Sequence, residues 1–255
     1  MAKNKIRSLD IFRVFLRSFF VQSVWNYRSL ISAGFGICLF PIVKRLYKDQ
    51  ASQKAFLDRH LKFFNAHPYM VSYALGVSIH LEEAFASGDE SAGKKLDRIK
   101  ELLTGILGAV GDKLFWSTIK PFSLIMGMAA LMYTNTPFEW VIVLLCTFIL
   151  YNTPHFYLRL TGIIEGYKKG INIYKQLGEK RFLPLQLFYT SVGVIGFLLF
   201  LIFLITKISM ENPINLGVVL GAAALAGTIY NLKRNYYLTI ISTLGISILA
   251  GILFL

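Results

Sequence analysis

The chain has 255 residues, of which 55% are apolar, 15% aromatic and only 16% charged. A soluble domain carries about 25% charged residues, so this composition excludes an ordinary soluble protein and indicates an integral membrane protein. The formal charge is +13. The cations cluster beside apolar blocks and form no single stripe between aromatic residues, which favours a membrane protein with basic inner loops and excludes a nucleic-acid partner.

The cysteines and the N-terminus give no sign of redox chemistry or of a cleaved leader. Cys38 and Cys146 each lie in apolar sequence without metal-ligand or redox spacing, and we interpret both as small core residues. The first apolar run is interrupted by Arg7, Arg13 and Arg17 and has no small-residue cleavage pattern. We therefore expect no cleavable signal.

Residues 8–20 have the pattern of a basic amphipathic helix. Ser8 can cap it, and Asp10 lies in its first turn, where the helix dipole favours an anion. Apolar side chains form one face, and Arg13 and Arg17 share the opposite side. Such a helix is expected to lie on the inner leaflet of the membrane. The alternative is a helix that docks on a partner subunit.

Two apolar runs in the first hundred residues are too short to cross a bilayer. Residues 30–41 and residues 69–81 each hold about twelve or thirteen residues, whereas a spanning helix needs about 20. We expect re-entrant or surface-lying segments here. Pro68 prevents the preceding basic helix from continuing past His67.

Three amides near these runs are candidate site residues. Gln22 and Asn26 belong to a stretch of mixed polar and aromatic residues, and Asn65 follows the basic helical pattern. Each can equally serve as a cap or as a contact to another subunit.

The stretch from residue 100 to residue 121 carries the strongest candidates. Gly105, Gly108 and Gly111 are three residues apart, and in a soluble helix each would cost about 1 kcal/mol relative to Ala. In a bilayer, small residues allow close approach, and broken helices are tolerated around a cavity. Next come Asp112 and Trp116, and a charge at mid-membrane depth costs about 3 kcal/mol or more. We expect a glycine-broken hairpin that presents Asp112 to water, a partner or a ligand; the alternative is a turn at the cytoplasmic surface.

His60, His67, His80 and Glu83 raise the alternative of a metal site, and so of an integral membrane enzyme. The chain has no HExxH or paired ExxH pattern, and Pro68 separates the groups. We therefore expect interfacial histidines with ordinary hydrogen bonds, and neither a metal nor a cofactor.

The fold class predicted from these patterns is an all-α integral membrane protein with about five transmembrane helices, further re-entrant or interfacial helices and an N-terminal amphipathic helix. Six Lys and Arg residues lie between 159 and 181, while the loop at 134–140 has none. The positive-inside rule then places the N-terminus in the cytoplasm and the C-terminus outside. The predicted spans are residues 114–133, 141–158, 186–206, 214–230 and 237–255.

We expect a single membrane domain, 1–255, with three parts. Residues 1–100 form the basic, re-entrant cytoplasmic-side half, residues 101–185 the glycine-broken hairpin and a helix pair, and residues 186–255 three transmembrane helices. The spacing of Gly162, Gly166 and Gly170 makes a smooth helix face, which we assign to packing with a partner.

Several motifs in the chain resemble one known family. LRSFFVQSVWNY, RHLKFFNAHPY, GILGAVGDKLFW and GIIEGYKKG, with the LEE at residues 81–83, occur in the order found in enzyme IID of mannose/fructose/sorbose-type phosphotransferase system (PTS) permeases. The resemblance covers nearly the whole length. It rests on Arg17, Gln22, Trp25, Asn26, Arg59, His60, Asn65, Pro68, Glu82, Glu83, Gly105, Gly111, Asp112, Trp116, Gly162, Gly166, Tyr167 and Gly170.

This resemblance implies a multi-pass subunit of the bacterial cytoplasmic (inner) membrane that is not catalytic on its own. It would pair with the membrane subunit IIC to form the path of a hexose, which the cytoplasmic IIB protein, supplied with phosphate by IIA, phosphorylates. Asp112, Gly111, Gly108 and Trp116 are then expected at the sugar path. Ile106, Lys113 and Ala109 replace two prolines and a glycine of the family pattern, which motivates the alternative of a transport-deficient regulatory or scaffold protein.

Overall fold

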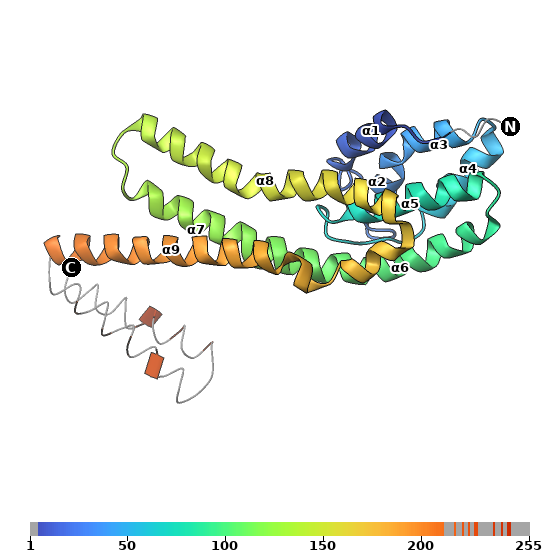
Figure 1. Cartoon of the computed structure of the whole chain (residues 1–255). Coiled ribbons are helices and arrows are strands. Elements are labelled where there is room, and N and C mark those ends of the chain that lie inside the picture. The colour runs from blue at the N-terminus through green and yellow to red at the C-terminus, as the bar shows by residue number, and fades with distance from the viewer. Residues whose placement is uncertain are drawn as a thin grey trace.

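The computed structural model describes residues 5–211 and the single positions 217, 221, 224, 227, 228, 237, 241, 244 and 245. All named elements in this part of the chain are helices (Figure 1). They are α1 (Ser8–Ser18), α2 (Ser32–Cys38), α3 (Phe40–Leu46), α4 (Gln50–His60), α5 (Val71–Ala86), α6 (Glu90–Gly111), the π-helix η1 (Asp112–Ile119), α7 (Lys120–Leu131), α8 (Pro137–Lys169), the 3₁₀-helix η2 (Gly170–Gln176) and α9 (Glu179–Glu211).

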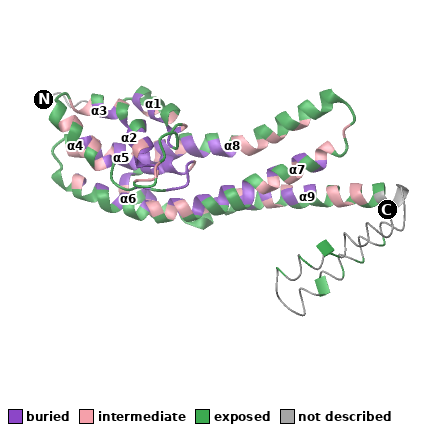
Figure 2. Cartoon of the chain, turned by 180° about the vertical axis from the view of Figure 1, so that it is seen from behind, coloured by how far each residue is buried: buried purple, intermediate pink, exposed green. Residues whose placement is uncertain are grey.

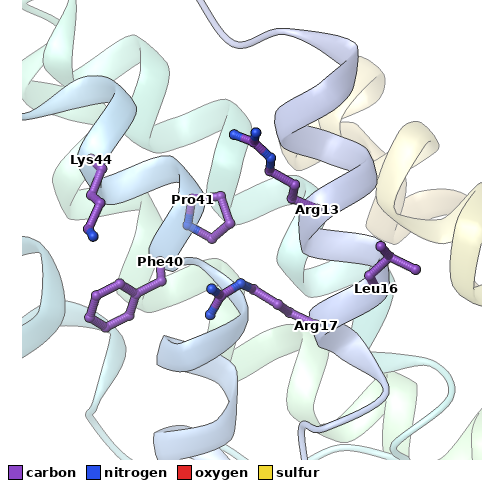
Figure 3. Close-up of a pocket in the computed structure, with 6 residues that line it drawn as sticks. All are labelled: Arg13, Leu16, Arg17, Phe40, Pro41 and Lys44. Carbon is purple, nitrogen blue, oxygen red and sulfur yellow. The ribbon is translucent and has the colours of Figure 1, made fainter.

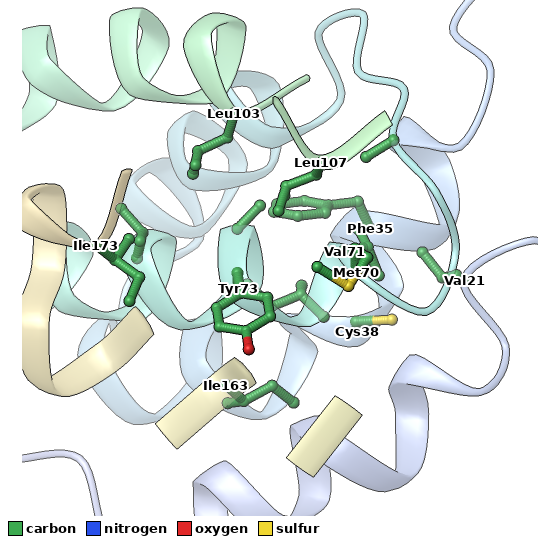
Figure 4. Packing of buried hydrophobic residues seen from close by; sticks show 14 of the residues in the cluster. Val21, Phe35, Cys38, Met70, Val71, Tyr73, Leu103, Leu107, Ile163 and Ile173 are labelled. Carbon is green, nitrogen blue, oxygen red and sulfur yellow. The ribbon is translucent and has the colours of Figure 1, made fainter. Parts of the chain in front are cut away.

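The core lies at the end of the molecule that holds α1 to α5. The central helix is α5, which buries nearly every residue from Val71 to Glu82 between α6 and α8. Phe35, Tyr73, Leu107 and Ile163 bring side chains from four helices into this cluster (Figure 4). The short apolar runs thus pack inside the protein itself, and their placement relative to the bilayer stays a prediction.

Long helices extend from this end (Figure 1), and many of their residues are exposed (Figure 2). The exposed residues include many large apolar ones. Three helical stretches are long and apolar enough to cross a membrane: Glu90–Leu131, Pro137–Gln176 and Glu179–Lys207. A large exposed apolar surface of this kind is typical of contact with lipid or another chain. The prediction of an all-α membrane protein is thereby confirmed.

The predicted span count is tested only in part. The runs 114–133, 141–158 and 186–206 lie within the three long stretches. The runs 214–230 and 237–255 lie mostly outside the described residues. Five spans therefore stay a prediction, as does the side of the membrane on which each terminus lies.

The predicted glycine-broken hairpin is wrong. α6, η1 and α7 follow one another without a turn, so residues 90–131 form one continuous helix that passes through Gly105, Gly108 and Gly111. The chain widens into a π-helix directly before Pro121, which has no N–H to donate to an α-helical bond. The backbone groups thus keep helical partners, and no broken segment is needed. The hairpin of this region is instead the turn at 132–136 between α7 and α8.

Two helices begin at carboxylate side chains, and the first begins differently from expectation. Ser8 is the first residue of α1, not its cap; the Asp10 carboxylate accepts a hydrogen bond from the Arg7 backbone N–H at 3.1 Å. The polar stretch 87–95 is mostly helical, because Asp89 accepts a bond from the Ser91 N–H at 3.0 Å and caps α6. Carboxylates at these positions satisfy amide groups that have no partner within the helix.

Candidate functional site

Gly162 and Gly166 lie in the seam between α8 and α5 of the same chain. A Cβ at Gly162 would overlap the side chain of Ser72, and one at Gly166 would overlap the backbone of Tyr73. Gly76 faces them from α5, where a Cβ would overlap the backbone of α8. The prediction that this face packs against a partner is therefore wrong, because the buried α5 already occupies it.

Gly170 ends α8 in the left-handed region, with φ +53°. A Cβ there would be 2.7 Å from the His80 ring, whose Nδ1 lies 2.9 Å from the carbonyl oxygen of Tyr167. Glycine is needed both for the backbone angle and for this close approach. Its assignment to partner packing is also wrong.

Glu82 is the centre of a buried polar cluster that joins two of the sequence motifs. Its carboxylate accepts hydrogen bonds from Arg59 Nε at 2.9 Å and Nη2 at 2.8 Å, and from Tyr47 Oη at 2.9 Å. His60 Nε2 lies 3.1 Å from the same carboxylate. Burial lowers the pKa of His60 to about 4. Burial alone would raise the pKa of Glu82, but the bonds from His60 and Arg59 hold it below its ordinary value. These residues tie α4 to α5, and we interpret them as structural.

Glu83 also connects separate segments of the chain through hydrogen bonds. It accepts hydrogen bonds from the Ile6 N–H at 2.8 Å and from Tyr167 Oη at 2.6 Å. The two neighbouring carboxylates therefore fasten different parts of the chain to α5.

A second cluster lies where α5, α8, α1 and η1 meet. The His67 side chain lies over Gly111, stacks on Phe115 with ring centroids 5.1 Å apart and meets the edge of Trp116 at 5.5 Å. Its Nδ1 accepts a bond from the Tyr69 N–H at 3.3 Å. Burial, followed by the charge of Arg159, lowers the pKa of His67 to about 4. The ring is thus neutral, with its proton on Nε2.

His155 and Arg159 on α8 complete this cluster. The His155 ring lies 4.0 Å from that of Tyr69, and the Arg159 guanidinium lies over the rings of Phe19, at 4.7 Å, and Tyr69, at 5.4 Å. Arg159 donates to the Ser18 carbonyl oxygen. We call His67, Tyr69, Phe115, His155 and Arg159 the His67–Arg159 cluster.

Some buried polar atoms of the His67–Arg159 cluster have no hydrogen-bond partner among the described residues. They are His67 Nε2, both ring nitrogens of His155 and Arg159 Nε. Arg159 is only 2% exposed, and no carboxylate of the described residues forms an ion pair with it. Buried polar groups are nearly always paired, and a buried cation without an anion is costly. The N–H groups among these atoms therefore lack acceptors within the described residues, which makes the cluster a candidate for contact with a ligand or another subunit.

The chemistry available to this cluster is binding. Two imidazole rings and a guanidinium offer N–H donors among aromatic faces, which suits hydroxyl, carbonyl or carboxylate oxygens. The nearest thiol, Cys38, has a pKa raised by burial to about 12, so it stays protonated and unreactive.

Asp112 lies on the exposed side of η1, away from the His67–Arg159 cluster. Within the described chain its carboxylate has no hydrogen bond or ion pair, and Trp116 and Lys120 are exposed with it. The Lys120 ammonium lies 4.7 Å from the Trp116 ring centroid. Gly111 faces inward against His67, whereas Gly108 borders open space. The structure thus divides this group of predicted residues between two faces of one helix.

The three candidate amides do not form a common site. Asn26 accepts bonds from the N–H groups of Arg28, at 3.1 Å, and Ser29, at 2.9 Å, and so stabilises a turn. Gln22 and Asn65 are exposed and have no side-chain hydrogen bond to the described residues.

The histidines considered for a metal site have separate partners. His60 meets Glu82, His67 meets Phe115, and His80 meets Tyr167. No group of three or more His, Cys, Asp or Glu side chains in the described part of the chain is arranged to hold a metal ion.

Reasoning from sequence missed Tyr69, His155 and Arg159. Arg159 begins the basic segment after an apolar run, so it reads as one more inner-loop cation. His155 offered the clearer signal, because an ionisable residue within an apolar run is a functional candidate by itself.

Comparison with known families gives a match over almost the whole chain. A family model described as "PTS system mannose/fructose/sorbose family IID component" matches residues 5–253.

Individual relatives agree with this match. The mannose-specific EIID component of Escherichia coli (strain K12) is 36% identical over 177 residues, which cover 69% of this chain and 61% of that protein. The sorbose-specific EIID component of Klebsiella pneumoniae is 33% identical over 178 residues, covering 70% and 63%. The fructose permease IID component of Bacillus subtilis (strain 168) is 30% identical over 179 residues, also covering 70% and 63%. The aligned part spans less than two thirds of the length of these curated relatives.

Two solved structures are similar. One, described as a cryo-EM structure of the mannose transporter ManYZ in complex with microcin E492, has a TM-score of 0.59 and 27% identity, covering 98% of both chains. Another, described as a membrane protein, has a TM-score of 0.63 and 34% identity, covering 75% of this chain and 68% of that one.

Proposed function

The chain belongs to the mannose/fructose/sorbose family of PTS IID components, and from this premise we propose that it forms the path of a hexose together with a IIC membrane subunit. The cytoplasmic IIB protein phosphorylates the sugar as it arrives, and IIA resupplies IIB. The chain itself contributes binding surface and carries out no bond-breaking step.

The observation that carries this proposal is the family match over residues 5–253, to which the exposed apolar surface of the long helices adds support. A helix that is buried in lipid on one side and in a sister subunit on another needs apolar residues on most of its surface. The relatives named for mannose, sorbose and fructose support a hexose as the transported substrate.

Two surfaces are proposed to work in this role. Asp112, Trp116 and Lys120 form an acid, an aromatic ring and a cation on the exposed side of a helix that is long enough to span. An unpaired carboxylate there is costly in hydrocarbon, which favours a position beside water, sugar or a IIC helix. The second is the His67–Arg159 cluster, whose buried N–H groups lack acceptors among the described residues and are proposed to become accessible to the same partner in the assembled complex.

The proposed location is the bacterial cytoplasmic membrane, with the N-terminus inside and the C-terminus outside. We treat 1–255 as one membrane unit whose first hundred residues lie at the cytoplasmic side. The basic segments near residues 7–17 and 159–181 support this orientation.

The experiment expresses the full chain with its IIC, IIB and IIA neighbours in cells that lack other hexose permeases. Uptake of labelled hexose, accumulation of hexose phosphate and co-purification of IIC are measured together. Asp112→Ala is expected to lower uptake at least tenfold at normal abundance. Glu101→Ala, which removes an exposed carboxylate from α6, is the matched control and should retain uptake.

The alternative function is a transport-deficient regulatory or scaffold protein, motivated by Ile106, Ala109 and Lys113 in place of the family residues. It predicts IIC association without any hexose phosphate in the wild-type complex. Sugar phosphate in these cells would reject it, and normal uptake by Asp112→Ala would reject the role of that carboxylate.

A further inference from the structure

A basic pocket lies between α1 and α3, outside every cluster described above. Its volume is about 390 Å³, and its lining residues are Arg13, Leu16, Arg17, Phe40, Pro41 and Lys44. Figure 3 shows Arg13 and Arg17 extending from α1 toward α3, which contributes Phe40, Pro41 and Lys44. We propose that this pocket binds the phosphate group of an anionic phospholipid of the surrounding membrane.

The charge of the pocket is the first argument. Three cations line it, and no carboxylate does. Arg13 approaches Asp10 only to 3.9 Å, and that carboxylate also faces Arg45 at 3.6 Å. Arg17 uses one N–H for the Ile37 carbonyl at 3.3 Å. The remaining guanidinium donors are available to phosphate oxygens, which arginine binds through paired hydrogen bonds.

The geometry of the cations is the second argument. Arg13 and Arg17 are one helical turn apart on α1, so their side chains leave the same side of the helix. Lys44 comes from the last turn of α3, where it adds a third donor from the opposite wall. The pocket is thus lined by cations from two elements, and a phosphate bound in it could accept hydrogen bonds from both.

The apolar rim decides between a lipid and a free phosphate ion. Leu16 is 48% exposed and Phe40 38% exposed at the pocket itself, and Leu9 and Phe12 continue the exposed apolar row along α1. A free ion would leave these side chains facing water. A phospholipid supplies the phosphate together with the acyl chains that cover them, as expected for a basic amphipathic helix at a membrane surface.

The test titrates the purified full-length chain, in neutral detergent, with phosphatidylglycerol or with phosphatidylcholine of the same acyl chains. Native mass spectrometry counts the lipid molecules retained. Because each cation near an anionic surface is worth about a fivefold gain in partitioning, we expect at least a tenfold preference for one phosphatidylglycerol molecule. Arg13→Gln/Arg17→Gln/Lys44→Gln should abolish this preference.

The matched control is Lys54→Gln/Lys94→Gln/Arg98→Gln, which removes the same charge from exposed positions on α4 and α6 that do not line the pocket. It should keep the preference. Arg13→Lys/Arg17→Lys, which retains the charge but not the paired donors, should reduce the preference without abolishing it and guards against loss of fold. Sugar uptake is not part of this readout, so failure here leaves the transport role standing.

Three outcomes would overturn the proposal. The first is equal retention of the two lipids by the wild-type chain. The second is an unchanged preference in the Gln triple variant of the pocket. The third is displacement of phosphatidylglycerol by an equal concentration of inorganic phosphate or of a glutamate-rich peptide, which would assign the pocket to a free anion or to a protein partner.

Discussion

His67 packs directly on Gly111, so closely that a Cβ at residue 111 would overlap the Cβ of His67. This contact joins the segment before α5 to the last residue of α6, and the His67 ring lies nearly parallel to that of Phe115, with an interplanar angle of 12°. One of the three glycines near Asp112 is thus needed for packing, while Gly105 and Gly108 border open space.

Gly111→Ala should destabilise the fold by about 1–3 kcal/mol, because an added methyl forces His67 and the backbone apart. Gly108→Ala is the matched control on the same helix, and it should be neutral or stabilising by up to about 1 kcal/mol, since Ala favours a helix. Thermal unfolding of the two variants in detergent measures the difference. Equal unfolding midpoints would contradict the close packing.

Glu82→Ala should cost about 3–5 kcal/mol and strongly reduce the amount of folded protein. It leaves the Arg59 guanidinium, the His60 ring and the Tyr47 hydroxyl without their common acceptor, and breaking a buried ion pair from one side is costly. Glu101→Ala, an exposed carboxylate on α6, should change stability by less than about 0.5 kcal/mol. Membrane abundance and unfolding midpoint are the measurements, and a stable Glu82→Ala protein would show that the bonds to Glu82 contribute little.

Stability should fall as the pH drops from about 6.5 to about 4. The pKa values of His60 and His67 are lowered by burial from 6.5 to about 4, so in this window the unfolded chain binds more protons than the folded one. Each histidine contributes on the order of 3 kcal/mol across the window. Unfolding midpoints measured between pH 4 and pH 8 test this, with the values above pH 7 as the reference. A flat profile would mean that the two rings bind protons over the same pH range in the folded and the unfolded chain.

Arg159→Met should leave the fold intact and reduce IIC association or hexose uptake. Replacing a buried, unpaired cation by an apolar side chain of similar length is often neutral or stabilising. If Arg159 had only a structural role, the Arg159→Met variant would instead lose abundance and function together. Co-purification of IIC, normalised to the amount of folded chain, separates the two cases, and a variant with full association and uptake would exclude a binding role.

The sequence predicted several elements because their patterns are local. The low charge content indicated a membrane protein, and the long apolar runs at 114–133, 141–158 and 186–206 predicted helices that the structure contains. The order of the motifs identified the family before any contact was known. Spacing was misleading at Gly105, Gly108 and Gly111, because three glycines at the cost known from helices in water were not enough to break a helix 42 residues long.

The amino-acid order alone thus determined the helical class, the apolar surface and the family, since composition and periodicity depend only on neighbours along the chain. Tertiary structure decided the rest. It turned Gly162 and Gly166 inward against α5, paired Arg59 and His60 with Glu82, and brought His67 to Arg159 across 92 positions. Such contacts depend on which helix faces meet, and that is set by packing among residues far apart in sequence.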